Sequence, residues 1–150
     1  MLKAAAVWSA VSLISGAVMK LPLNLYRRRP DLGPKARESA AGHPTHRLVR
    51  RRANHERSAA QFWRVLMVDA LLWNNSYAFI DQDSPGSPRE MFNLLPDRTG
   101  AERLRADDVF ESTGSERLAS DLDGQLVYVT EVDGKLRTLF PSQVFHLQGI

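Results

Sequence analysis

Three histidines in the first half of the chain have the residue type that could bind a metal ion. His43 and His46 are three positions apart, and His55 lies further along. A zinc site needs three or four converging ligands with ordered outer partners, and the chain has no cysteine and no carboxylate cluster near these histidines. We therefore predict no metal site. His146 stands alone in a strand-like segment, where we expect a hydrogen-bonded structural histidine and not a catalytic base.

Several acidic residues are spaced as in calcium-binding or acid–base sites. Asp81 to Gly86 has the acids and the glycine of the first half of a calcium loop, but Pro85 and Phe92 stand where oxygen ligands are needed. That segment predicts a turn. Two other acidic pairs lack an aromatic pocket that would make one carboxyl an acid and the other a base, so we expect solvated acids at Asp107-Asp108 and at Asp121 with Asp123.

No sequence motif indicates catalysis. A glycine-rich phosphate loop and a Gly-x-Ser-x-Gly elbow are both missing, and nothing couples the serines and histidines into a triad. The sequence predicts a protein that is not an enzyme, with no catalytic, cofactor-binding or metal-binding residues and no cofactor.

The basic residues gather at the front of the chain. The net charge is +3, but residues 1–57 hold twelve basic residues against three acidic ones, whereas residues 58–150 hold eight against fourteen. Two triplets, Arg27–Arg29 and Arg50–Arg52, carry much of the positive charge. Such runs indicate either a solvated face or a surface for nucleic-acid phosphates or an acidic partner. No aromatic residues interleave with them, as a single-strand binding groove requires.

The element that must organise this chain is the segment from Phe62 to Ile80. Ser58 and Gln61 have the spacing of a capping box, which predicts a helix starting near Ala59. Its apolar arc is so wide that we expect a core helix with little surface in water. The turn formers after Trp73 and the aromatic and branched residues of 77–82 predict a strand directly after it.

The remaining pattern predicts an α+β fold in one domain of 150 residues, with two main helices packed on a small, mostly antiparallel sheet. The second main helix is residues 4–20, which is too short and too rich in serine for a membrane span. A short helix is expected over 44–52. Proline and glycine mark 30–42 as an exposed loop, and 98–123 reads as an irregular insertion. The expected strands are 23–27, 77–82, 91–95, 125–132, 135–140 and 142–147, with a tight turn at Asp133-Gly134.

Several motifs in fixed order resemble the portal proteins of tailed double-stranded DNA bacteriophages. They are the helix-to-strand residues Leu71, Leu72, Asn74, Tyr77, Ala78 and Ile80, then Leu95-Pro96-Asp97-Arg98, then Pro141, Val144, His146 and Gly149, with Val11–Tyr26 and His43–Asn54 upstream. Asn74 stands where the family usually has glycine, and asparagine tolerates the left-handed backbone that glycine adopts. Leu147-Gln148 replaces the usual Ile-Arg. Because subunits of that family are considerably longer, residues 1–150 look like the amino-terminal, wing-like part.

The resemblance implies a structural subunit of the ring at the capsid portal vertex through which viral DNA is packaged and ejected. The implied partners are other portal subunits in a homo-oligomeric ring, the packaging ATPase (terminase), capsid and head–tail connector proteins, and double-stranded DNA. It implies no membrane, and a location in the virion, with assembly in the host cytoplasm. The opposite charges of the two halves suggest a further hypothesis, in which an acidic surface of the later half meets the basic front of a neighbouring subunit.

The residues alone leave two other functions open. One is a small basic nucleic-acid-binding module that uses Arg27–Arg29 and Arg50–Arg52 to hold phosphates. The other is an exported or membrane-tethered domain, because Lys3 precedes an apolar stretch.

Overall fold

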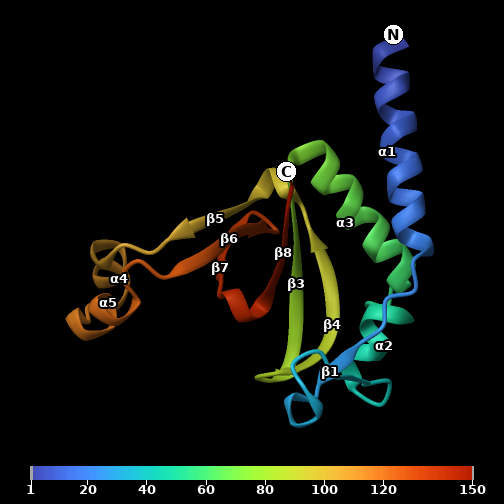
Figure 1. Cartoon of the computed structure of the whole chain (residues 1–150). Coiled ribbons are helices and arrows are strands. Elements are labelled where there is room, and N and C mark those ends of the chain that lie inside the picture. Colours follow the sequence, from blue (N-terminus) through green and yellow to red (C-terminus); the bar gives the residue numbers. More distant parts are fainter. Residues whose placement is uncertain (1, 150) are drawn as a thin grey trace.

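The computed structural model describes residues 2–149, in which a central three-stranded sheet has helices on one side and a second sheet on the other (Figure 1). The α-helices are α1 (Leu2–Lys20), α2 (Pro44–Arg50), α3 (Ala59–Trp73), α4 (Ala106–Thr113) and α5 (Glu116–Leu122). The strands are β1 (Tyr26–Arg28), β2 (Arg37–Ser39), β3 (Asn75–Ser84), β4 (Ser87–Leu94), β5 (Thr99–Arg103), β6 (Leu126–Val132), β7 (Lys135–Leu139) and β8 (Val144–Gln148). Three 3-10 turns join them: η1 (Pro30–Leu32), η2 (Pro96–Arg98) and η3 (Pro141–Gln143). The strands described pair only antiparallel, which confirms the α+β class.

The predicted helix-to-strand unit is confirmed at both ends of α3. The Ser58 hydroxyl accepts from the Gln61 backbone N–H, and the Gln61 side chain accepts from the Ser58 N–H, so the capping box satisfies two otherwise unpaired donors. At the other end Asn74 adopts φ 59° and ψ 4°, the left-handed conformation that stops the helix. The chain then enters β3 immediately.

Gly149 closes the same corner from the far end of the chain. Strand β8 pairs with β3 from Asn75↔Gln148 to Phe79↔Val144, and the Gly149 N–H then donates to the Asn74 carbonyl oxygen at 2.8 Å. A Cβ atom at Gly149 would lie 2.2 Å from Asn74 Oδ1 and 2.8 Å from its carbonyl oxygen. Only glycine therefore fits here, because its backbone lies directly against the helix end.

The first hydrophobic core lies between α3 and the central sheet. Phe62 and Leu66 of α3 are almost fully buried against Leu48 of α2 and Ala78 and Met91 of the sheet. The Trp63 indole N–H donates to the Val49 carbonyl oxygen at 2.9 Å, which fastens α2 to α3.

A buried asparagine organises the turn that leads into α3. The Asn54 amide N–H donates to the Met91 carbonyl oxygen at 2.7 Å, and Asn54 Oδ1 accepts from the backbone N–H groups of Glu56 and Arg57. The Met91 N–H donates to the Ala53 carbonyl oxygen at 2.8 Å. These bonds hold residues 53–57 against β4, so α3 starts at a fixed place over the sheet.

Proline turns carry the chain between the two larger sheets. The orders are β4-β3-β8 and β5-β6-β7; η2 leads from β4 to β5, and η3 leads from β7 back to β8. Both turns start with proline, which has no N–H to leave unpaired at that position. The predicted Asp133-Gly134 turn between β6 and β7 is confirmed, with φ of 53° and 70°.

His146 lies where the two sheets meet. Its ring stacks on Tyr77 with centroids 4.5 Å apart and contacts Tyr128 edge-on at 5.6 Å. Because Asn75 Oδ1 only accepts, His146 Nε2–H donates to it at 2.9 Å, and Nδ1 faces the Tyr128 hydroxyl at 3.4 Å. The neutral ring thus has a partner on each side, as predicted for a structural histidine. Burial lowers the pKa of His146.

Four details of the predicted fold need correction. Helix α1 packs along α3 and not on a sheet, so the prediction of two main helices on one sheet is wrong for α1 (Figure 1). The strands form three sheets, because proline turns separate the two larger ones and β1 pairs only with β2. The range 30–42 is not all loop, since it contains η1 and β2, and the range 98–123 is not irregular, since it contains β5, α4 and α5.

None of the described helices is long and apolar enough to cross a lipid bilayer.

We predict that Gly149→Ala lowers the free energy of unfolding by about 1–3 kcal/mol, because the added Cβ forces the corner at Asn74 apart. Urea denaturation followed by circular dichroism measures this. Gly16→Ala is the matched control, since the Gly16 Cβ position is open and lies within α1. That change should raise stability by up to about 1 kcal/mol. Equal effects of the two substitutions would contradict the close approach at Gly149.

We also predict that the fold loses stability as pH falls from 8 to 5.5. Burial in the folded state lowers the pKa of His146, so the unfolded state binds more protons as pH falls through the ordinary value of about 6.5. Urea midpoints at the two pH values measure the loss. His146→Gln, which cannot titrate, should reduce the pH dependence while lowering stability at pH 8. An unchanged pH dependence in this variant would contradict the role assigned to His146.

Candidate subunit interface

The three candidate metal-ligating histidines have separate structural surroundings. His43 caps α2, because its Nδ1 accepts from the Thr45 N–H at 3.2 Å. His55 lies on the surface, with Nδ1 3.4 Å from Glu90 Oε1. Within the described part of the chain, no three histidine, aspartate or glutamate side chains gather as a metal site would require.

The calcium-like segment is the turn between β3 and β4. Pro85 and Gly86 form its tip, with Gly86 at φ 83°. Asp81 bonds to the guanidinium of Arg89 across the hairpin at 2.6 Å, and Asp83 lies 3.7 Å from the same group. Both acids therefore interact with Arg89 within the hairpin, and the predicted turn is confirmed.

The two arginine triplets are partly engaged within the chain. Arg29 pairs with Asp31 at 2.8 Å and with Glu38 at 2.7 Å, and these two hydrogen bonds raise its pKa. Arg50 bonds to the Asn24 side chain, and Arg52 to the Asn54 and His55 carbonyl oxygens. Half of the six guanidinium groups therefore hold the front of the chain together.

Apolar side chains are exposed along α1 and at the end of α3. On α1, Val11 and Ser15 face α3, whereas Trp8 is 61% exposed and Leu13 76% exposed. At the end of α3, three consecutive residues and the nearby loop residue are exposed: Leu71, Leu72, Trp73 and Leu95. The expectation that α3 has little surface in water is wrong, because only Ala59, Phe62 and Leu66 of α3 are buried. Exposed apolar surface of this extent is typical of a protein-binding face.

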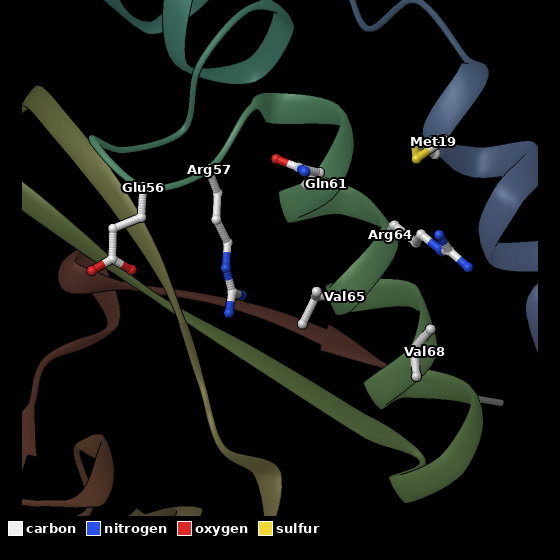
Figure 2. Close-up of a pocket in the computed structure, with 7 residues that line it drawn as sticks. All are labelled: Met19, Glu56, Arg57, Gln61, Arg64, Val65 and Val68. Carbon is white, nitrogen blue, oxygen red and sulfur yellow. The ribbon is translucent and has the colours of Figure 1, made fainter.

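A hollow of about 550 Å³ lies on the outward face of α3 (Figure 2). Its apolar lining comes from Met19 of α1 and from Val65 and Val68 of α3, and its polar lining from Glu56, Arg57, Gln61 and Arg64. Figure 2 shows Arg57 and Val65 pointing into the same space, with Arg64 on the side toward α1. We call this the α3 hollow.

A carboxyl group on α3 is also partly withdrawn from water. Burial raises the pKa of the Asp69 carboxyl; the positive charge of Arg57 opposes that rise, and the negative charge of Asp97 on η2 adds to it. The carboxyl of Asp69 near the end of α3 is thus influenced by the charge of Asp97 in the turn that leads into the second sheet.

The short helices α4 and α5 form an acidic tip that stands clear of the body (Figure 1). They pack on each other through the buried Val109 and Ala119, and two bonds between Leu104 and residues 124–125 close the tip at its base. Residues 104–123 hold two arginines and six exposed acids: Asp107, Asp108, Glu111, Glu116, Asp121 and Asp123. Leu118 on α5 is 47% exposed.

Sequence reasoning missed the exposed apolar residues, the α3 hollow and the acidic tip. The wide apolar arcs of 4–20 and 59–73 were the available signal, but such an arc is the same for a core and for a face that another subunit covers. The tip was missed because its helices are short.

Comparisons with known proteins place this chain among relatives of known type. The chain is 24% identical over 148 residues to the portal protein of Enterobacteria phage HK97, covering 99% of this chain and 30% of that protein. Its fold is similar to chains in the neck of an empty gene transfer agent particle computed with C6 symmetry (TM-score 0.63, 22% identity) and in the native gene transfer agent virion (TM-score 0.62, 22% identity). These similarities cover 95% of this chain.

The chain spans about a third of the length of these relatives, since it covers 30% of the phage protein and 32% and 31% of the two particle chains. A family described as phage portal protein matches residues 5–150. This match extends over nearly the whole chain, and therefore the chain belongs to the phage portal protein family.

Proposed function

We propose that this chain is the amino-terminal, wing-like part of a subunit that forms a closed ring at the portal vertex of a virion. The observation that carries the proposal is the family match over residues 5–150, together with a fold shared with chains of a particle neck. The role is structural: the chain builds a passage for double-stranded DNA and carries out no reaction.

The surface of the chain supports a ring contact. In a ring each subunit uses two different faces, one for each neighbour, and the contact repeats until the circle closes. The exposed apolar residues of α1 and the end of α3 offer one such face, and the acidic tip offers another on the opposite side of the central sheet (Figure 1). A further chain of similar fold, at TM-score 0.60, comes from the neck of a native gene transfer agent particle computed with C12 symmetry, so cyclic arrangements occur around a similar fold.

The other partners follow from the position at the vertex. They are the packaging ATPase (terminase), capsid proteins, head–tail connector proteins and the DNA that passes through the ring. The subunit would reach the virion after assembly in the host cytoplasm.

A basic nucleic-acid-binding module remains the second candidate function. Three arginines support the nucleic-acid-binding function, since no hydrogen bond or ion pair of their guanidinium groups is found among the described residues: Arg27, Arg28 and Arg51. The engagement of Arg29, Arg50 and Arg52 within the chain weakens it, because three of the six charges already have partners.

We predict that the purified chain associates with itself as its concentration rises and retains little double-stranded DNA at about 150 mM salt, a physiological ionic strength. Sedimentation velocity measures the association, and fluorescence anisotropy with a labelled duplex measures the binding. Arg27→Ala with Arg28→Ala and Arg51→Ala is the control for phosphate contacts. A monomer that binds DNA tightly, loses it steeply as salt rises, and loses it again in this variant would contradict the ring role.

A further inference from the structure

We propose that the acidic tip of one subunit, α4 with α5, docks in the α3 hollow of the next subunit. This inference rests on the proposed ring function and names the residues on each side of one contact. The occupant is therefore a second copy of this chain.

The acidic tip projects from the body of the subunit, as expected of a segment that contacts a neighbouring subunit. Among the side chains described in these two helices, Val109 and Ala119 are buried, and the ribbon of β5 and β6 holds the helices away from the body (Figure 1). In this arrangement Leu118 and the six acids of the tip are exposed to solvent. Burying Leu118 against another surface would remove apolar area from water.

The α3 hollow has the complementary chemistry. Val65, Val68 and Met19 give it an apolar lining, which suits Leu118, and Arg57 and Arg64 lie beside that lining. The Arg57 guanidinium donates to the uncharged Asn93 side chain at 3.1 Å, and its charge also acts on the partly buried Asp69, whereas Arg64 has no ion pair among the described residues. The Arg64 charge is thus available to Asp121, which lies three residues after Leu118 and on the same face of α5.

The two surfaces cannot meet within one subunit. The tip lies beyond the second sheet, whereas α1 and α3, which line the α3 hollow, lie on the other side of the central sheet (Figure 1). A contact between them must therefore be between copies, and it joins two different faces, as ring closure requires. The arginine triplets are less suited as the partner surface, because three of their six guanidinium groups already bond within the chain.

The chain has no cysteine, so single engineered cysteines can test the contact. Val68→Cys places one thiol in the α3 hollow, and Leu118→Cys places one on the tip. We predict that mixing these two proteins under mild oxidation forms a mixed disulfide at least about tenfold faster than mixing Val68→Cys with Leu136→Cys, because docking raises the local concentration of one thiol near the other. Leu136 is a demanding control, since it is 76% exposed on β7 and Leu118 only 47%.

The charges have their own test in the same reaction. Arg64→Glu in the Val68→Cys protein should slow the reaction, and Asp121→Arg in the Leu118→Cys protein should restore it, because the pair of charges is then exchanged. A purely structural effect of Arg64→Glu would not be rescued by a change in the other protein. Raising the salt concentration should slow the reaction between the Val68→Cys and Leu118→Cys proteins that carry no charge exchange. Glu56→Cys, on the exposed rim of the hollow, replaces Val68→Cys if circular dichroism shows that the latter is unfolded.

The outcomes separate this contact from the ring function itself. Selective cross-linking with rescue supports the contact. Self-association in the centrifuge without selective cross-linking overturns the contact and leaves the ring role standing. A chain that neither associates nor cross-links selectively contradicts both.

Discussion

The left-handed backbone at Asn74 is the constraint on which the rest of the fold depends. It reverses the chain from α3 into β3, and β3 pairs on both of its edges, with β4 and with β8. Gly149 then bonds to the same residue, so a helix end, a central strand and the last described strand share one corner. Asparagine serves here because it tolerates positive φ better than other residues that carry a side chain, and its oxygen leaves no space for a Cβ at Gly149.

Local signals predicted most of the elements. The capping box at Ser58 and Gln61 and the positive-φ turn at Asp133-Gly134 act over a few residues, so they can be recognised without tertiary structure. The division of the strands into separate sheets was not readable in this way. The packing of the two larger sheets on each other was not readable either, because it depends on Tyr77, Tyr128 and His146, which come from three strands and meet only after folding.

The candidate interface was harder to predict than the fold, for a physical reason. Trp8, Leu13 and Trp73 have the helical spacing and the apolar character of core residues, yet they are exposed in the single chain. A subunit of an assembly carries such residues on its surface because a neighbour completes their burial. A hydrophobic pattern indicates that a residue is more stable away from water. It does not indicate whether the same chain or a neighbouring subunit covers that residue.

The narrow attachment of the second sheet has a mechanical consequence. Two proline turns and the ring cluster at His146 join it to the central sheet, and β5 extends from that joint for about 17 Å at the usual strand rise. The ribbon of β5 and β6 therefore extends outward from a joint at the aromatic rings. Because α4 and α5 lie at the outer end of the ribbon, any rotation at this joint would move them further than it moves the strands beside the rings.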